Sequence, residues 1–488
     1  MHTRILAHPI RTLLLAALSL SACGATAIPL TSQQTPSSRS WLAGDHHIHS
    51  RYSAGWDTTT TPPSPVIAGD ARYPIPQNAE MALRHGLSWM VSTDHGGPNH
   101  SKVNLEMAYP ELLGSRKSVP GLIQFYGMEF DTPGADHSSL IIPHGDHEHE
   151  TLYEIESRFA KRDVFPTDRS RDTEPKMLEA LEYMKTFETD PVLIANHPSR
   201  SAPGLGNYGN DDPAELRDWN DTAPRIAVGS EGSPGHQANA INRDGSLDPR
   251  GRRGGYGNHP TYGGFDQMAG RLGGFWDSML GEGRRWWITA SSDSHANWRD
   301  GGSDFWPGEY SKTYVHAAND YDDVLEGIRS GRVFVTLGDL ISELDFTAKV
   351  QGSSAAAAMI GGALQVPANA EVDVVMRIRD PQGVNHHGDR REVARVDLIL
   401  GEIAGPVADR MQDTNTTTRV IRRFTSADWT RDGEYLTMRM TLQDVHHSSY
   451  IRLRGTSGQE IEPQVDPLGE DPWSDLWFYS NPIFLEVQ

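Results

Sequence analysis

The chain reads Asp45-His46-His47-Ile48-His49-Ser50 at the end of its first predicted strand, residues 45–49. Successive side chains of a strand point to opposite faces, so His47 and His49 share one face. Two imidazoles on one face can bind one cation, and imidazole suits zinc, iron or manganese. This stretch therefore predicts a strand whose end carries ligands for a metal ion.

Four further clusters of metal-type ligands follow short apolar runs. They are Thr93-Asp94-His95, Gly127-Met128-Glu129, Asn196-His197-Pro198 and Ser292-Asp293-Ser294-His295. Each stands at the C-terminal end of a predicted strand, which is where the active sites of parallel barrels lie. One histidine in such a place is usually an ordinary polar residue. Five clusters in one order favour a shared metal site.

The predicted strands alternate with helices up to about residue 340. The expected strands are 45–49, 87–93, 122–130, 138–142, 192–196, 225–230, 286–290 and 332–337, and the expected helices are 78–85, 174–187, 265–280 and 321–329. This alternation is typical of a parallel α/β barrel or sheet. Residues 207–264 are rich in glycine, asparagine, aspartate and proline, which predicts long loops near a site. Beyond residue 340, short alternating runs such as 372–378 and 436–442 predict a β-sandwich.

The composition excludes some function classes. With 44 Lys+Arg against 65 Asp+Glu, the formal charge is −21. Such a charge repels a long polyanion, so polymeric nucleic acid is not an expected partner. The single cysteine, Cys23, lies near the start, so no disulfide and no thiolate nucleophile is expected in the folded domains.

The first 40 residues indicate export. Arg4 and Arg11 precede a short apolar run, residues 12–18, as in a secretory signal. The ending Leu20-Ser21-Ala22-Cys23-Gly24 resembles the lipobox of bacterial lipoproteins. This implies a signal peptide over 1–22, lipidation of Cys23, and a flexible tether over 23–40. We therefore expect a lipid-anchored protein of the cell envelope. It would lie on the periplasmic face of the outer membrane if the bacterium has two membranes. The alternative is ordinary cleavage after Ala22 or Ala25.

The motifs occur in the order His-x-His, Thr-Asp-His, Gly-x-Glu, a later His, His-Pro and Ser-Asp-x-His. This order resembles that of the PHP (polymerase and histidinol phosphatase) domain of metal-dependent phosphoesterases, over about residues 43–338. The resemblance implies a distorted (β/α)7 PHP-type barrel at 41–339. The alternating runs beyond it predict a C-terminal β-sandwich-like domain at 340–488. The resemblance also implies two or three divalent metal ions, zinc, manganese or iron, at the C-terminal ends of the barrel strands.

The resemblance further assigns ligands to three metals. Those of the first are His47, His49, Glu129 and Asp293. Glu129 would bridge to a second metal completed by His137 and His197. His95 and His295 would hold the third. The family usually adds a histidine shortly after the first motif, which this chain lacks, and Asp57 is the expected substitute.

The implied reaction is hydrolysis of a small phosphate ester by metal-bound hydroxide. His95, His197 and His295 are candidates for proton transfer, although water could protonate the leaving group equally well. Arg200, His100 and Glu231 are candidate substrate-binding residues. Two alternatives remain open: a metallohydrolase of an amide or lactone, and a catalytically silent binding lipoprotein. The sequence does not indicate the oligomeric state.

Overall fold

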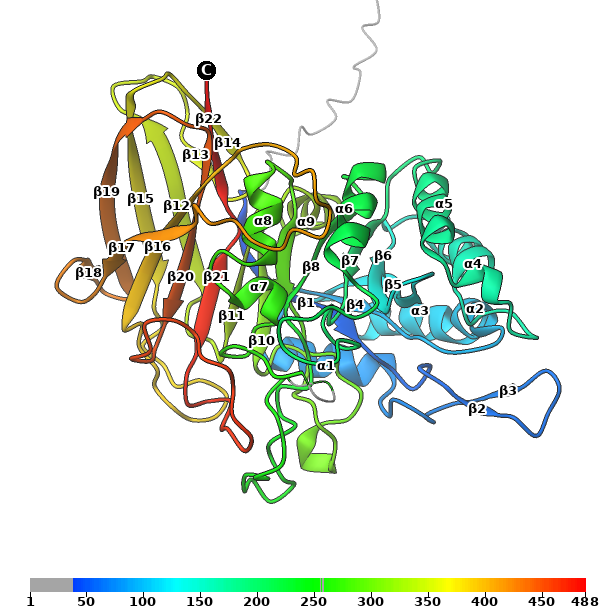
Figure 1. Ribbon diagram of the computed structural model, residues 1–488. Helices are drawn as coiled ribbons and strands as arrows, with labels where there is room; N and C mark the ends of the chain where they lie inside the picture. Colours follow the sequence, from blue (N-terminus) through cyan, green and yellow to red (C-terminus); the bar gives the residue numbers. More distant parts are fainter. Residues whose placement is uncertain (1–37, 255, 257–258) are drawn as a thin grey trace, which may run out of the picture. The chain divides into compact units, whose positions relative to one another are not determined.

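A mixed α/β fold surrounds the predicted ligand clusters in the computed structural model, which describes residues 38–254, 256 and 259–488 (Figure 1). The predicted signal segment, Cys23 and nearly all of the predicted tether lie outside the described residues. Among the described helices, none has both the length and the apolar character needed to cross a membrane.

Most of the strands belong to one mixed sheet of 15 strands. Its N-terminal part contains β1 (Ser40–Ile48), β4 (Trp89–Ser92), β5 (Ile123–Asp131), β6 (His137–Ile141), β7 (Val192–Ala195), β8 (Ala227–Ser233) and β9 (Trp287–Ala290). These strands are neighbours in that order, and all are parallel except β6. A parallel bridge between Ile48 and Ser294 brings the end of β9 back to β1. The C-terminal ends of six parallel strands therefore gather at one edge.

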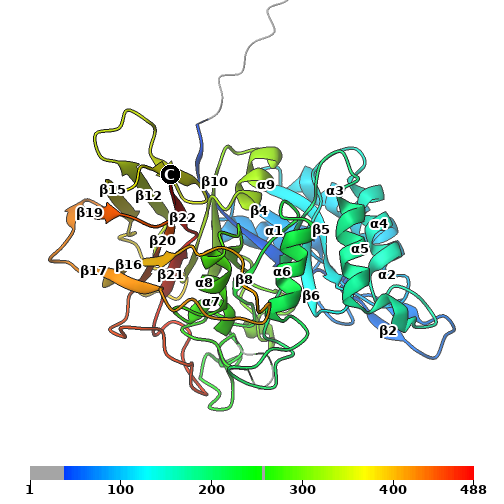
Figure 2. The same ribbon diagram turned by 45° about the horizontal axis from the view of Figure 1, so that its top comes forward.

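Helices connect and cover these strands, as Figure 2 shows. They are α1 (Ile75–Arg84), α2 (His100–Val103), α3 (Tyr109–Ser118), α4 (Glu148–Phe159), α5 (Glu174–Met184), α6 (Pro213–Thr222), α7 (Gln267–Gly270), α8 (Phe275–Gly281) and α9 (Tyr321–Arg329), with short turns η1 (Asn104–Ala108), η2 (Arg169–Arg171) and η3 (Trp298–Asp300). The start of α6 follows from its sequence, because the Asp212 side chain accepts hydrogen bonds from the first-turn N–H groups and Pro213 needs none. The prediction of one helix over 265–280 is wrong. Gly273, with φ of 71°, separates α7 from α8.

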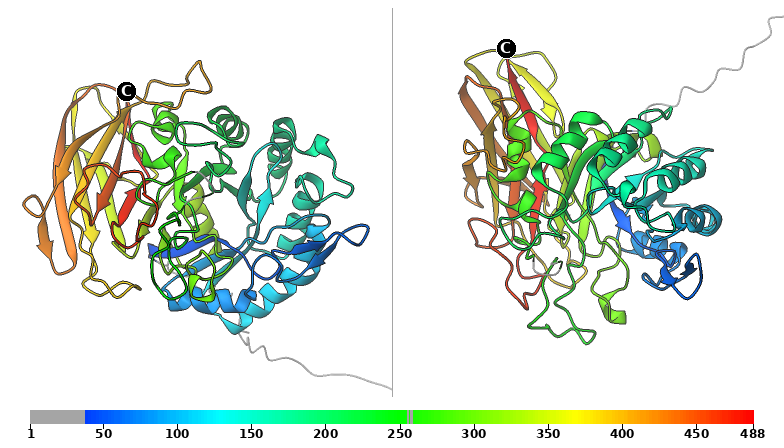
Figure 3. Two further views of the ribbon diagram at one scale, coloured as in Figure 1. Left: turned by 60° about the horizontal axis from the view of Figure 1, so that its bottom comes forward. Right: turned by 45° about the vertical axis from the view of Figure 1, so that its right-hand side comes forward.

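A separate two-stranded hairpin stands beside the large sheet, and a second set of strands extends that sheet. The hairpin β2 (Gly55–Asp57) and β3 (Ser64–Val66) projects from the strands in Figures 1 and 3. Strand β10 (Ser311–Ala317) pairs with β1 and with β11 (Val333–Leu337), and β11 pairs with β21 (Trp477–Ser480). Main-chain hydrogen bonds therefore continue the sheet into the last residues of the chain.

The C-terminal residues contribute strands to two sheets. The large sheet gains β14 (Ala363–Val366), β16 (Arg395–Glu402), β17 (Arg419–Phe424), β20 (Ser449–Thr456) and β22 (Ile483–Val487), and a five-stranded sheet contains β12 (Glu343–Val350), β13 (Ala358–Met359), β15 (Ala370–Arg379), β18 (Thr430–Asp432) and β19 (Tyr435–Val445). Buried and partly exposed residues alternate along β15, as expected for a strand with one face in a core.

The structure confirms the mixed α/β class and the β-rich C-terminal part. A specific (β/α)7 barrel stays a prediction. So does the domain boundary after Asp339, because residues 38–488 form one compact unit and β11 and β21 pair across that boundary.

Candidate metal centre

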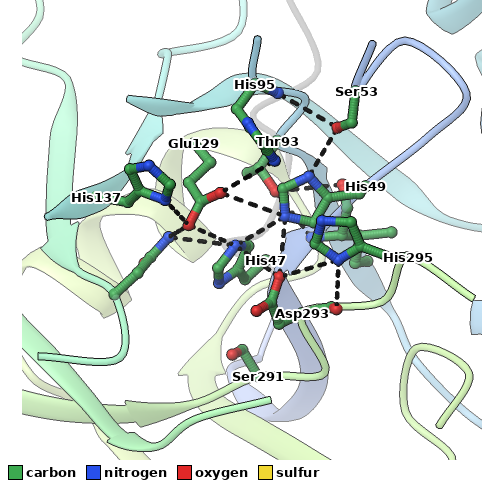
Figure 4. A network of polar contacts seen from close by, with 12 residues as sticks. His47, His49, Ser53, Thr93, His95, Glu129, His137, Ser291, Asp293 and His295 are labelled. Carbon is green, nitrogen blue, oxygen red and sulfur yellow. Dashed lines mark hydrogen bonds and ion pairs between the residues drawn. The ribbon is translucent and has the colours of Figure 1, made fainter. Parts of the chain in front are cut away.

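The predicted ligands come together at the edge where the parallel strands end (Figure 4). They reach one place because they lie at or shortly after the ends of parallel strands, or at the start of the antiparallel β6. The ligands are His47 and His49 at β1, His95 after β4, Glu129 on β5, His137 as the first residue of β6, His197 after β7, and Asp293 and His295 after β9. Donor atoms of these side chains form three groups, each within 4.8 Å: His47, His49 and Glu129; Glu129, His137 and His197; and His49, His95 and His295.

In the first group, imidazole nitrogens converge on a carboxylate. The Nε2 atoms of His47 and His49 are 3.0 Å apart, and Asp293 Oδ1 lies 3.1 and 2.9 Å from them. Glu129 Oε1 lies 3.2 Å from His47 Nε2. All four side chains are buried.

The other ring nitrogens fix the tautomers in this group. His47 Nδ1 lies 2.8 Å from Glu231 Oε1, and a carboxylate can only accept, so Nδ1 carries the proton. His49 Nδ1 lies 2.8 Å from Ser53 Oγ, whose own proton goes to Asp94 at 3.0 Å. Both Nε2 atoms therefore point into the same small space. Although burial opposes it, Asp293 and Glu129 raise the pKa of His47, so in the metal-free protein a proton stands where a metal ion would bind. This donor set fits a metal ion.

Glu129 connects the first group to the second. Its Oε1 atom lies 3.0 Å from His137 Nδ1 and 2.9 Å from His197 Nε2. His137 Nε2 lies 3.3 Å from Asp131 Oδ1, so each ring nitrogen of His137 faces a carboxylate. The position of Glu129 is that of a bridging ligand.

Asp70, which the sequence prediction missed, lies beside the third group. Asp70 Oδ2 lies 3.0 Å from His95 Nε2 and 3.7 Å from His295 Nε2. Although burial favours its neutral form, the hydrogen bond with His95 lowers the pKa of Asp70 to about 2. The assignment of Asp57 to this group is wrong. Asp57 lies in the projecting hairpin, where its carboxylate accepts from the N–H and hydroxyl of Thr59 at 2.9 and 2.6 Å.

Two of the three predicted substrate-binding residues are corrected. Both ring nitrogens of buried His100 are occupied, by Glu156 Oε1 at 2.7 Å and by the Tyr52 carbonyl oxygen at 2.9 Å. Glu231 is also buried, and its oxygens accept from His47, from the Ser291 hydroxyl at 2.5 Å and from the His197 N–H at 2.6 Å. Neither side chain is free to meet a substrate, and Glu231 instead orients the ligands.

Two half-exposed arginines lie beside the centre. Arg200 Nη1 is 3.4 Å from His137 Nδ1, and Arg162 Nη2 is 3.4 Å from His95 Nδ1. Asp131 holds the Arg162 guanidinium, with Oδ1 at 2.8 Å from Nε. The prediction for Arg200 is compatible with this placement. Arg162 was not predicted, because it lies in the irregular segment after α4.

The loop segment 207–264 supplies two more side chains that were not predicted. The Tyr256 hydroxyl donates to Asp293 Oδ2 at 2.8 Å. His236 Nε2 lies 3.5 Å from the same oxygen, and its Nδ1 lies 2.5 Å from Asp304. The composition of this segment placed it near a site, but it could not show which residues would reach the centre.

Charges within the centre perturb its titration. Burial disfavours the ionised form of Glu129, but His137 and His47 hold the pKa of that carboxyl well below its usual range. Burial likewise disfavours the charged form of His137, yet Glu129 raises the pKa of His137 to about 9. In the metal-free protein, therefore, protons occupy imidazoles that a metal would need as ligands.

Comparison with known proteins adds no family. No protein-family model matches the chain, and a search of curated proteins found no match. The structure defines a mixed α/β protein with buried histidine and carboxylate groups that can hold metal ions.

Proposed function

We propose that this protein is a PHP-type, metal-dependent phosphoesterase with a distorted (β/α)7 barrel, and that it hydrolyses small phosphate esters. The observation that carries the proposal is the convergence of the His47 and His49 Nε2 atoms, 3.0 Å apart, beside the Glu129 carboxylate. Glu129 joins this pair to a second donor group, as a bridging carboxylate does in a metal cluster.

The donor set suits zinc, manganese or iron, because it consists of imidazole and carboxylate with no thiolate. The first ion would be held by His47, His49, Glu129 and Asp293, the second by Glu129, His137 and His197, and the third by Asp70, His95 and His295. Such ions lower the pKa of bound water and neutralise charge on a transferring phosphoryl group.

The protein's own side chains would bind and orient the phosphate. The guanidiniums of Arg162 and Arg200 stand beside His95 and His137, and each is about half exposed. A guanidinium matches two phosphate oxygens geometrically, so these arginines would fix the ester against the centre. Tyr256 would keep Asp293 oriented through its hydrogen bond.

Exposure separates the three candidates for proton transfer. The His295 side chain is 19% exposed and that of His95 is 14% exposed, whereas that of His197 is 1% exposed. His95 and His295 are thus better placed than His197 to exchange a proton with a leaving group.

The site and the formal charge of −21 together support a small substrate with one or two phosphates rather than a polymer. Export and lipidation at Cys23 remain part of the proposal. If mass spectrometry finds a mature N-terminus beyond Cys23 with no lipid, the anchor is rejected.

The test combines metal analysis with a substrate panel. Purified protein is expected to contain more than one equivalent of zinc, manganese or iron, and to hydrolyse small phosphomonoesters or phosphodiesters. His47→Ala should lower the turnover by orders of magnitude, whereas His147→Ala, at an exposed histidine outside the centre, should not. Hydrolysis in isotopically labelled water should place the label in the phosphate product. Activity on amides or lactones alone, with metal bound, would contradict the proposal.

A further inference from the structure

A second pocket lies at the C-terminal end of α1 and shares no residue with the metal centre. Its volume is about 380 Å³. The end of α1, the start of β10, the turn after β11 and residues 381–391, which follow β15, line it. A pocket of this size accommodates a small ligand.

Cationic side chains outnumber carboxylates around this pocket. Arg84, Lys312, Arg379 and Arg391 line it, against Asp339 and Asp389. Lys312 is only 4% exposed and contacts Asp339 at 2.5 Å. Arg84 makes no ion pair with any described residue. The charged side chains of the lining sum to +2 in a protein whose formal charge is −21. Arg391 pairs with Asp389, and Arg379 pairs with Glu343 and Glu434, so Arg84 supplies the unpaired positive charge among the described lining residues.

Several buried polar atoms in the pocket lining have no hydrogen-bond partner among the described residues. They are both ring nitrogens of His85, Ser342 Oγ, Asn385 Nδ2 and Arg391 Nε. The Asn385 amide is oriented by its Oδ1, which accepts the N–H groups of His387 and Asp389 at 3.0 Å each, so its NH₂ end is the free one. Burying a donor without a partner is unfavourable, and four such residues in one pocket call for a common acceptor.

His85 contributes a neutral imidazole to this lining. It is 8% exposed, and its ring meets that of His386 edge-on at 4.5 Å between centroids. Burial, together with His386 and Lys312, lowers the pKa of His85 to about 3. One of its nitrogens is therefore an N–H donor at neutral pH, and the fixed positive charge of the pocket comes from the lysine and arginines.

We propose that this pocket binds a small oxyanion, a phosphate or carboxylate group with at least two oxygens. The donors of Ser342, Asn385 and Arg391 would contact the oxygens, and Arg84 and Lys312 would neutralise the charge. An oxyanion is the ligand class that offers acceptors to every free donor and matches the sign of the pocket. The inference does not depend on the proposed phosphoesterase activity.

The experiment is calorimetric titration of the full chain with inorganic phosphate and, separately, with citrate. The titrations are repeated in the Glu129→Gln variant, so that phosphate binding at the metal centre is distinguished from binding here. At least one anion should bind wild type and Glu129→Gln alike, and Arg84→Ala combined with Arg391→Ala should weaken that binding at least tenfold. Binding of phosphate alone or citrate alone identifies the preferred oxyanion.

Arg390→Ala is the matched control, because Arg390 is the sequence neighbour of Arg391 but contacts Gln382 and Glu392 instead of lining the pocket. It should bind the anion as wild type does. His85→Gln provides a second pocket variant and should also weaken binding. The proposal is overturned if neither anion binds at millimolar concentration, if binding disappears in Glu129→Gln, or if the folded pocket variants bind as tightly as wild type.

Discussion

Glu231 accepts hydrogen bonds from three groups around the metal centre, and two of them, the His47 ring and the His197 N–H, belong to candidate ligands. In Glu231→Gln, the NH₂ end of the new amide would face groups that are themselves hydrogen-bond donors. If it faces His47 Nδ1, that nitrogen must become an acceptor and Nε2 must carry the proton, which removes a metal ligand. We expect metal affinity to fall about 10–100-fold, as for other residues that orient ligands.

A zinc titration of the metal-free protein with a competing chelator would measure this loss. Glu156→Gln is the matched control, since Glu156 is an equally buried partner of a histidine, His100, outside the centre. It should lower stability without changing metal affinity. Equal metal affinities in the two variants would show that Glu231 does not orient the ligands.

A second prediction at the scale of the residue compares Asp70 with Asp57 as the carboxylate ligand of the third metal ion. Asp70→Asn should lower the metal content by about one equivalent, because Asp70 is the carboxylate beside His95 and His295. Asp57→Asn should leave the metal content unchanged, because that side chain bonds only within its hairpin. Elemental analysis of both proteins after identical metal loading decides between them. The opposite pattern would restore Asp57 as the ligand.

These residues show what the sequence could and could not predict about the candidate centre. His47 and His49 were predictable as neighbours because strand periodicity fixes which face a side chain occupies. Asp70 was not, because it follows an irregular hairpin, and no periodicity places such a residue in space. His100 was misplaced for a related reason, since its distance from Thr-Asp-His along the chain does not reveal which way a short helix turns.

At the scale of elements, helix α6 carries a buried acid that should make stability depend on pH. Burial and nearby Asp211 raise the pKa of Glu215 from 4.5 to about 9. Between these values the folded protein keeps a proton that the unfolded chain releases, so the free energy of unfolding falls as pH rises through this window. Glu215→Gln should therefore raise stability at pH 7–8 by on the order of 1–3 kcal/mol.

Urea denaturation of both proteins between pH 5 and 9 would test this prediction. The variant should lose less stability than wild type as pH rises, although Asp211, whose pKa burial also raises, retains part of the dependence. Glu179→Gln, at an exposed position on α5, should follow the wild-type curve. Parallel curves for wild type and Glu215→Gln would mean that Glu215 is ionised in the folded protein.

Elements differed in how well their sequences predicted them. Strands β4, β7 and β9 were predicted because each is a short, fully buried apolar run. The interval 265–280 has helical periodicity throughout, but Gly273 and Gly274 lie in the break between α7, which ends at Gly270, and α8, which begins at Phe275. The pairing of β11 with β21 was not predictable, because a sequence pattern does not identify strand neighbours that lie over 100 residues apart.

At the scale of the whole molecule, contacts across the predicted boundary join its N-terminal and C-terminal parts. Strand β11 is fully buried and pairs with β21. Asp277, at α8, forms a buried ion pair with Arg452 on β20, with its two oxygens 2.9 and 2.8 Å from Nε and Nη2. Removing the C-terminal part would expose the apolar face of β11 and leave the Asp277 charge buried without its partner.

We therefore expect residues 38–488 to unfold in one cooperative transition, and a chain that ends at Asp339 to be insoluble or unfolded. Asp277→Ala should lower the free energy of unfolding by about 3–5 kcal/mol, because it leaves the Arg452 charge buried and unpaired. Asp345→Ala, which breaks an exposed pair with Arg377, should cost less than about 1 kcal/mol. Calorimetry of the full chain and solubility of the shortened one measure these outcomes. Two separate transitions, or a folded and metal-binding fragment that ends at Asp339, would show that the parts are independent domains despite their shared sheet.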